Sequence, residues 1–222
     1  MVNKEILKRK KLFKILNQEL KKLFPQAKIA LNYSNPWELL VAVILSAQTT
    51  DQKVNEITAK LFKKYKTIDD YAKADLRQFQ EDIKGVNYYK NKAKFIIENA
   101  KIIKEKFGGK VPETMEELLT LKGVARKTAN IVLSVAFNKF AGIAVDTHVK
   151  RLSQILGLTK ETKPEKIEKD LIAIIPQGPE WRDFPLRLIQ YGRKYCSAKK
   201  HDHQNCPLTK VLLNYDRRAS RK

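Results

Sequence analysis

The residue whose setting best suits covalent chemistry is Lys127, a lysine that follows a glycine turn. It opens an apolar stretch, residues 127–137, whose pattern predicts a mostly buried helix. The helix dipole and any burial both disfavour the ammonium form at a helix start, so we expect a lowered pKa for Lys127. An amine with a lowered pKa is the nucleophile that Schiff-base chemistry requires. Lys127 is therefore a candidate catalytic nucleophile.

The turn before this helix is a candidate anion site. Gly123 can adopt backbone angles that are closed to other residues, so the chain can turn tightly there. The first backbone N–H groups of the helix have no partner within it, and a phosphate of DNA fits such a site. The residues expected to contact the phosphate, mainly through their backbone, are Gly123, Val124, Ala125 and Arg126.

A carboxylate, Asp146, follows at a distance that allows it to return to Lys127. A helix over residues 127–137 rises about 16 Å, and residues 138–145 can span roughly 26 Å if extended. Each residue alone has a plainer interpretation, since Asp146 before Thr147 is a typical helix N-cap and a lone lysine is usually a solvated surface charge. Their joint occurrence favours the catalytic interpretation.

The two segments that carry these residues, 121–129 and 145–148, resemble the helix–hairpin–helix DNA glycosylases, and among them the endonuclease III branch. The resemblance extends from about residue 30 to about residue 210. It departs from the usual pattern at Lys122, where proline is common, and at Ala125, where a second glycine is common. Alanine is strained there only if the position needs a positive φ.

The resemblance implies an enzyme that removes oxidised or saturated pyrimidines from duplex DNA and then nicks the strand at the abasic site. Lys127 would form the Schiff base, and Asp146 would assist the amine and stabilise charge on the sugar. Two further interpretations of the residues remain open. The chain could be a non-catalytic helix–hairpin–helix DNA-binding module, or a monofunctional glycosylase of the same fold, although such glycosylases lack a lysine at the Lys127 position.

Two other segments match parts of the family that enter the DNA duplex. Gln48, in the segment 45–51, falls where the family fills the gap left by a flipped base, and its amide can pair with the orphaned base. Tyr88, in the segment 83–89, falls at the position of an apolar wedge, with Asn87 in place of the usual glycine. The alternatives are a surface glutamine at a helix end and a tyrosine packed in the core.

The C-terminal region, residues 196–212, departs from the family most clearly. Most members hold an iron–sulfur cluster on four cysteines spaced C-x6-C-x2-C-x5-C, and the matching positions here are Cys196, His203, Cys206 and Leu212. Two thiolates are missing and Leu212 cannot bind a metal, so this degenerate motif predicts that the cluster is absent.

Zinc is the alternative ligand for this region, on Cys196, His201, His203 and Cys206. The residue types suit zinc, but His201 and His203 are closer in sequence than the usual histidine pair, which disfavours a zinc site. We therefore expect no cofactor, and a small apolar cluster of Leu208, Leu212 and Leu213 in its place.

The net charge of +21 and the pI of about 9.9 indicate a polyanionic partner. Residues 1–25 carry eight Lys or Arg against two Glu, and residues 187–222 carry ten against two Asp, so two-thirds of the excess lies at the two ends. Lys194 in the second of these segments is a candidate DNA contact. Solvated faces of lysine-rich helices account for part of the charge.

Helix start signals recur along the chain and strand alternation does not, which predicts an all-α protein of about ten helices. The resemblance implies two helical lobes around a DNA-binding cleft: residues 29–139 as a six-helix bundle with the hairpin, and residues 1–28 with 140–222 as the second lobe. The sequence has no membrane span or signal peptide, and two cysteines argue against a disulfide framework. We expect a cytoplasmic monomer that acts on duplex DNA.

Overall fold

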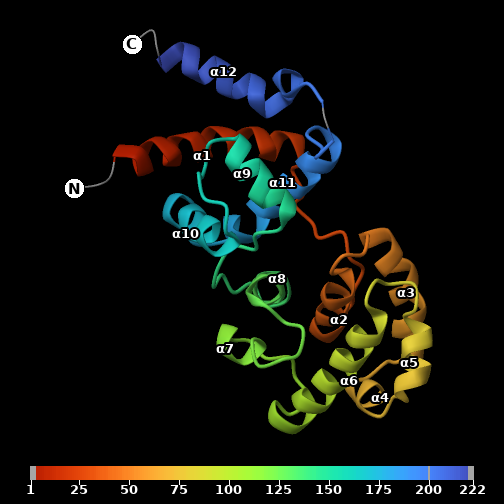
Figure 1. Cartoon of the computed structure of the whole chain (residues 1–222). Helices are drawn as coiled ribbons and strands as arrows, with labels where there is room; N and C mark the ends of the chain where they lie inside the picture. Colours follow the sequence, from red (N-terminus) through yellow and green to blue (C-terminus); the bar gives the residue numbers. More distant parts are fainter. Residues whose placement is uncertain (1–3, 200, 220–222) are drawn as a thin grey trace. The chain divides into compact units, whose positions relative to one another are not determined.

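The computed structural model describes residues 4–199 and 201–219, and this part of the chain consists of helices and the loops that connect them, with no strand (Figure 1). The prediction of an all-α fold is confirmed. None of the described helices combines the length and the apolar character that a bilayer crossing requires.

The chain divides into two compact units. The central unit comprises Ala30–Ala141, and the terminal unit comprises Met1–Ile29 together with Gly142–Lys222. The chain therefore enters the terminal unit, leaves it for the central unit and returns, and each unit is described on its own below.

The central unit is built around one almost entirely buried helix, α2 (Pro36–Ser46). Its sequence from Leu39 to Leu45 is uninterrupted apolar, and a helix that is apolar on all sides must be surrounded by protein. It packs against α3, α6 and α8. The other helices of this unit are α3 (Asp51–Lys64), α4 (Ile68–Ala72), α5 (Leu76–Asp82), α6 (Tyr89–Lys106), α7 (Met115–Leu118) and α8 (Arg126–Ala136).

Most helix starts in the central unit follow from capping side chains that the sequence shows. The side chain of Asn35 accepts a hydrogen bond from the backbone N–H of Glu38 at 2.9 Å, and Thr114 and Asp75 cap α7 and α5 in the same way. In the terminal unit, α10 begins at Pro164, and its N-cap residue Lys163 makes no side-chain cap.

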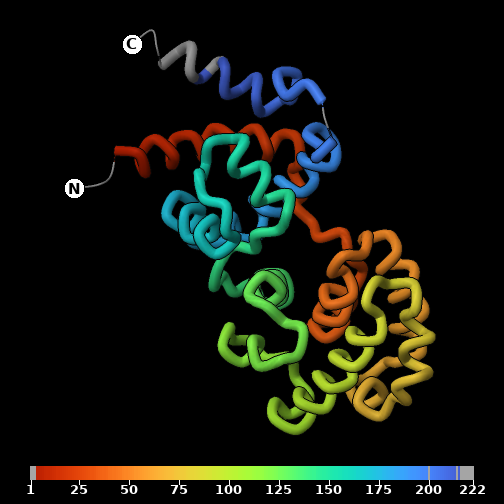
Figure 2. Tube along the Cα trace, viewed as in Figure 1, coloured from red at the N-terminus to blue at the C-terminus, as the bar shows by residue number. Residues whose placement is uncertain are grey.

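The terminal unit joins the two ends of the chain. Its helices are α1 (Lys4–Leu23), α9 (Thr147–Ile155), α10 (Pro164–Ile174), α11 (Glu180–Lys194) and α12 (Pro207–Ala219), with the short 3-10 helix η1 (His203–Asn205). Helix α1 packs against α10, α11 and α12, and Figure 2 shows the N-terminal segment running beside the C-terminal one.

A buried ionic cluster ties α1 to α11. Arg187 is 5% exposed and its guanidinium lies 2.9 Å from the carboxylate of Glu180. The amide of Asn17 donates to the same carboxylate at 2.9 Å, and Lys21 pairs with it at 2.6 Å. Burial acts to raise the pKa of Glu180, but these partners hold it below its ordinary value. Because a buried charge is costly when unpaired, the cluster specifies how α1 docks on α11.

Candidate active site

The glycine turn before α8 is fixed by a buried asparagine of α6. The side chain of Asn99 donates to the carbonyl of Lys122 at 2.9 Å and accepts from the N–H of Lys122 at 2.7 Å. Gly123 has a φ of 71°, and a Cβ added there would lie 2.8 Å from the ring of Phe95. Both the backbone and the available space therefore require glycine at this position.

Helix α8 begins at Arg126, one residue before the predicted start. Its N-cap is Ala125, which has extended backbone (φ −94°, ψ 171°), so the strain that alanine would have suffered at positive φ does not arise. Ala125 provides no side-chain hydrogen bond to the first turn. The side chain of Val124 is buried, so this residue can offer only its backbone to a ligand. The geometry suits an anion at the helix start.

Lys127 lies in the first turn of α8 with an exposed side chain, next to Arg126, which is also exposed. The buried face of α8 consists of the residues that follow at helical spacing, such as Ala129, Val132 and Leu133. The helix thus anchors its apolar face on the core of the central unit and presents the amine of Lys127 at its N-terminal end.

Gln48 and Tyr88 lie on two neighbouring loops of the central unit. The side-chain amide of Asn87 donates to the carbonyl of Gln48, and the N–H of Asn87 donates to the hydroxyl of Thr49 at 3.1 Å. Gln48 and Tyr88 are both exposed, and both have left-handed backbone, with φ of 56° and 58°. Tyr88 is 63% exposed, so it does not pack in the core. Left-handed backbone at non-glycine residues costs about 1–2 kcal/mol and is concentrated at functional sites.

Lys92 stabilises the loop that contains Gln48 through hydrogen bonds from its buried ammonium group. This α6 residue is 5% exposed, and its ammonium donates to the carbonyls of Leu45 and Ala47 at 2.8 and 2.6 Å. Burial lowers the pKa of Lys92 to about 8. Neither Lys92 nor Asn99 was predicted from the sequence as a supporting residue. A usable signal exists, because both lie at helical spacing from Ile96 and Ile103 on the apolar stripe of α6, where an unpaired polar residue is costly.

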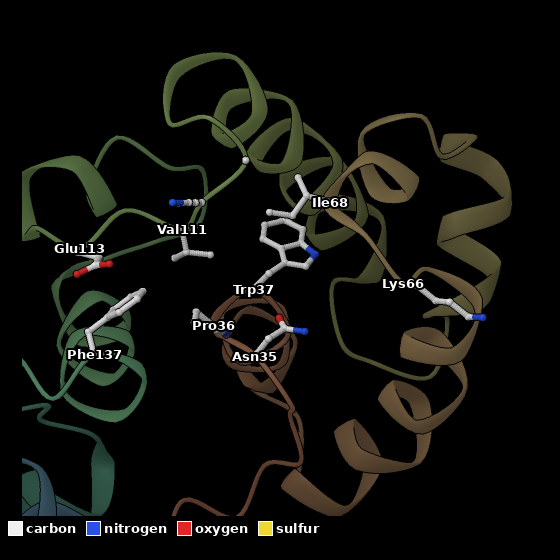
Figure 3. Close-up of a pocket in the computed structure, with 10 residues that line it drawn as sticks. Asn35, Pro36, Trp37, Lys66, Ile68, Val111, Glu113 and Phe137 are labelled. Atoms are coloured by element: carbon white, nitrogen blue, oxygen red, sulfur yellow. The ribbon is translucent and has the colours of Figure 1, made fainter.

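The loops and Lys127 lie at the same end of the helix pair α2 and α8. These helices pack against each other, and residues 35–37 at the start of α2 share a cavity of about 400 Å³ with Phe137 at the end of α8, so the helices run in opposite directions (Figure 3). Gln48 follows the end of α2, and Lys127 lies at the start of α8. The cavity at the far end of the pair, beside Trp37 and Val111, is therefore separate from this candidate site.

Asp146 belongs to the terminal unit, where it is the N-cap of α9. Its Oδ1 accepts a hydrogen bond from the N–H of Val149 at 2.8 Å, and its Oδ2 lies 3.2 Å from Nδ1 of His148. The capping interpretation of Asp146 therefore holds for one carboxylate oxygen. The second oxygen is oriented by His148, and the side chain is 18% exposed.

Lys194 is the last residue of α11, with an exposed side chain whose Nζ lies 5.1 Å from the ring centroid of Tyr195. Of the expected apolar cluster nearby, Leu208 is fully buried, but Leu213 is 45% exposed and Leu212 is only partly buried. That part of the prediction is wrong for Leu213, because it lies on the outer face of α12.

The prediction that this region lacks a metal cofactor is also wrong. Cys196, His201, His203 and Cys206 bring four potential ligand atoms within 4.8 Å of one another, an arrangement that can hold a metal ion. The short His201–His203 spacing, which led us to disfavour zinc, is no obstacle to metal binding in this fold. Asp202 accepts a hydrogen bond from the N–H of Gln204 at 2.9 Å and starts the η1 turn, and this turn lets both imidazoles reach the cysteines.

Comparison with known proteins gives the family. Residues 41–177 match the model of the HhH-GPD superfamily base excision DNA repair proteins. The chain belongs to this family. It is 51% identical to endonuclease III of Synechocystis sp. over 85% of this chain and 86% of that protein. It is 45% identical to endonuclease III of Bacillus subtilis, with 88% and 89% covered.

Solved structures agree with the sequence relatives. A structure of a trapped endonuclease III–DNA covalent intermediate, in an estranged-adenine complex, is 40% identical and covers 95% of this chain and 96% of that one, with a TM-score of 0.85. A non-covalent endonuclease III–DNA complex has the same TM-score at 39% identity and covers both chains completely. The predictions of the endonuclease III branch and of a DNA glycosylase and abasic-site lyase are confirmed.

Proposed function

We propose that this protein removes oxidised or saturated pyrimidines from duplex DNA and cleaves the resulting abasic site through a Schiff base on Lys127. The observation that carries this proposal is an exposed lysine in the first turn of α8, directly after a glycine turn whose helix start has no capping side chain. Such a start can bind a DNA phosphate through backbone N–H groups while it presents the amine beside it.

The reaction starts with a damaged nucleotide that has left the base stack. The neutral amine of Lys127 attacks the anomeric carbon of the sugar, the bond to the damaged base breaks, and the base departs with the bonding electrons. Loss of the amine proton and opening of the sugar ring give the Schiff base. This iminium acidifies the neighbouring carbon, and β-elimination breaks the strand on the 3′ side.

Asp146 assists this chemistry in two ways in the proposal. Its carboxylate takes up a proton from the attacking amine, and its negative charge stabilises positive charge that develops on the sugar. The support from the structure is that the cap bond to Val149 and the contact with His148 fix the carboxylate in one orientation. A preoriented charge needs no reorganisation during the reaction.

Gln48 and Tyr88 act on the duplex around the flipped nucleotide. Their exposed side chains project from two loops that are hydrogen-bonded to each other through Asn87. We assign Gln48 to pairing with the orphaned base, because an amide both donates and accepts, and Tyr88 to the wedge between base pairs. Basic residues of the terminal unit, including Lys194, contact the DNA backbone.

A panel of three duplexes tests the function. One carries thymine glycol, one an abasic site, and one adenine opposite oxidised guanine. We expect nicking of the first two and no action on the third. Cleavage of the abasic duplex alone would contradict the glycosylase activity on pyrimidines, and excision of the adenine would assign the protein to a different substrate class.

A protein with duplex DNA as substrate belongs in the compartment that holds the DNA, and for this chain we propose the cytoplasm. One chain carries Lys127, Asp146 and the duplex-entering loops, so we propose that it acts as a monomer.

A further inference from the structure

Four side chains with metal-binding atoms gather between α11 and α12. Cys196 follows α11, Cys206 immediately precedes α12, and His201 and His203 lie on the connection between them. The Sγ of Cys196 lies 3.5 Å from Nδ1 of His203, and the Sγ of Cys206 lies 3.3 Å from Nε2 of His201. All four ligand atoms lie within 4.8 Å of one another.

The two shortest of these separations are those of ligands around a single small ion. A tetrahedral zinc ion binds sulfur at about 2.3 Å and imidazole nitrogen at about 2.0–2.1 Å, so its ligands are separated by about 3.3–3.8 Å. The two sulfur–nitrogen distances of 3.3 and 3.5 Å fall within that range. A contraction of the longer separations to the same range would close the tetrahedron.

The groups around the ligands are arranged as metal sites arrange them. Nδ1 of His201 lies 2.8 Å from the carbonyl of Lys199, so this nitrogen carries the proton and Nε2 offers its lone pair towards Cys206. Ligating histidines are almost always held by such a bond from the other ring nitrogen. Arg151 in α9 donates to the carbonyl of Cys196 at 2.6 Å and its guanidinium lies 3.7 Å from the sulfur, so a side chain from a neighbouring helix fixes this residue.

We infer that Cys196, His201, His203 and Cys206 bind one zinc ion in a closed tetrahedral site. Two thiolates and two neutral imidazoles balance the charge of Zn²⁺, which suits a site whose cysteines are 2% and 3% exposed. An iron–sulfur cluster of four irons takes four thiolates, and this chain contains two cysteines. The donor set of this chain therefore differs from the four-cysteine motif that its family resemblance implied.

The zinc ion links the end of α11 to the start of α12. The connection between these helices contains two buried cysteines, but its other described residues are largely exposed, so few apolar contacts hold it in place. Four metal bonds replace those contacts, and a closed site with four protein ligands has a structural role with no open position for substrate. The inference concerns folding of the terminal unit and does not depend on the proposed reaction.

Metal analysis of the full-length protein tests the inference. The protein is purified without air from cells supplied with both iron and zinc, and its metal content and visible absorption are measured. We expect one zinc per chain and no visible band. Four irons per chain, two irons per chain with a cluster spectrum, or protein that remains metal-free when titrated with zinc would each overturn the inference.

Variants identify the ligands. Cys206→Ser and His201→Gln should lose stoichiometric zinc, whereas the control Gln204→Ala, which changes an exposed side chain in the same loop that is not a ligand, should retain it. Full zinc content in Cys206→Ser would overturn the assignment. Because ligand variants can unfold, the wild-type protein is also stripped with a chelator. Its melting temperature should fall and should be restored by Zn²⁺ but not by Mg²⁺, and cobalt substitution should give tetrahedral d–d absorption. A melting temperature that is insensitive to zinc, or cobalt absorption of octahedral type, would contradict a structural tetrahedral site.

Discussion

The Nζ of Lys92 lies 2.6 Å from the carbonyl oxygen of Ala47, the residue directly before Gln48. A buried lysine therefore supports, through one backbone group, the loop that we expect to enter the DNA duplex. The same ammonium also binds the carbonyl of Leu45, so two carbonyls at the end of α2 depend on it. The position of Gln48 therefore depends on Lys92 of α6 as well as on the loop that contains Gln48.

Lys92→Met should destabilise the central unit by about 1–3 kcal/mol, because it leaves buried carbonyls without a donor. The difference in unfolding free energy between wild type and variant should also depend on pH. The folded pKa of Lys92 is about 8 against an ordinary value of 10.5, so between these values the unfolded state binds more protons and wild-type stability rises with pH relative to the variant. Chemical denaturation at pH 7, 8, 9 and 10 measures the difference. A difference that stays constant with pH would contradict the lowered pKa.

Lys127→Ala should abolish the covalent intermediate. Removal of a covalent nucleophile typically lowers the rate by about 10³-fold or more, while the backbone N–H groups of the helix start remain available for a phosphate. Borohydride trapping on an abasic duplex, with the adduct mapped by peptide mass, measures the first effect, and a binding assay on the same duplex measures the second. The neighbouring exposed residue offers a control, because Arg126→Ala should still be trapped. An adduct that persists in Lys127→Ala would refute the assignment.

Asp146→Asn should separate the two roles of this side chain. The amide oxygen can still accept the 2.8 Å bond from Val149, so the melting temperature should change little, while base excision should fall by about 10²–10⁴-fold. Asp146→Ala removes the cap as well and should cost about 1 kcal/mol of stability. Thermal unfolding and single-turnover excision are compared for both variants. Excision that declines only in step with stability would leave Asp146 as a structural cap alone.

Tyr88→Gly should raise stability and lower DNA binding at the same time. The φ of 58° at Tyr88 is strained for tyrosine and relaxed for glycine, so the substitution should stabilise the protein by about 0.5–1 kcal/mol. Loss of the exposed ring should weaken binding to a damaged duplex by roughly 5- to 150-fold, the effect of about 1–3 kcal/mol of lost base stacking. Tyr88→Phe is the control that keeps the ring and should bind normally. Unaltered binding by Tyr88→Gly would exclude the wedge role.

Neutralising Arg193, Lys194 and Lys199 together should flatten the salt dependence of DNA binding. Each lost phosphate contact reduces the slope of log K against log salt by about 0.9, so three contacts would reduce it by about 2.7. Binding isotherms at several salt concentrations measure the slope, with Lys63, Lys64 and Lys66 of the central unit replaced in a matched control. An equal reduction in both triple variants would place no specific contact at the end of α11 or in the segment that follows it.

The sequence predicted the features that depend on residues only a few positions apart, above all the helix starts. Asn35 and Asp75 announce helix starts because a capping side chain acts within four residues, and the glycine at 123 followed by an apolar stretch locates α8 within one residue. The roles of Lys92 and Asn99 were not predicted because their hydrogen-bond partners are carbonyls and N–H groups 23 to 47 residues away in the chain. The metal site was missed for a different reason, because its four residues lie within residues 196–206.

The metal prediction was wrong because it relied on the sequence spacing of His201 and His203. Whether two histidines can bind one metal depends on the directions in which their rings point. Usual spacings describe histidines on a regular helix or hairpin, whereas His203 begins a tight turn that sends its ring back towards His201, with centroids 4.2 Å apart. Only the fold shows where that turn points, since of the two cysteines it meets one follows the end of α11 and the other precedes the start of α12.

The hydrogen bond between Asn17 and Glu180 sets an order for folding during synthesis. These partners are separated by 163 residues, and a ribosome that adds about 5–20 residues per second needs roughly 8–30 s to bridge that interval. The central unit emerges meanwhile and can complete its own core. Helix α1 spends the same interval with Phe13, Leu16 and Leu20 uncovered, and the surplus of six positive charges in residues 1–25 keeps the waiting segment repelled from its own copies. Helix α1 is thus the first helix to be synthesised and among the last to be packed.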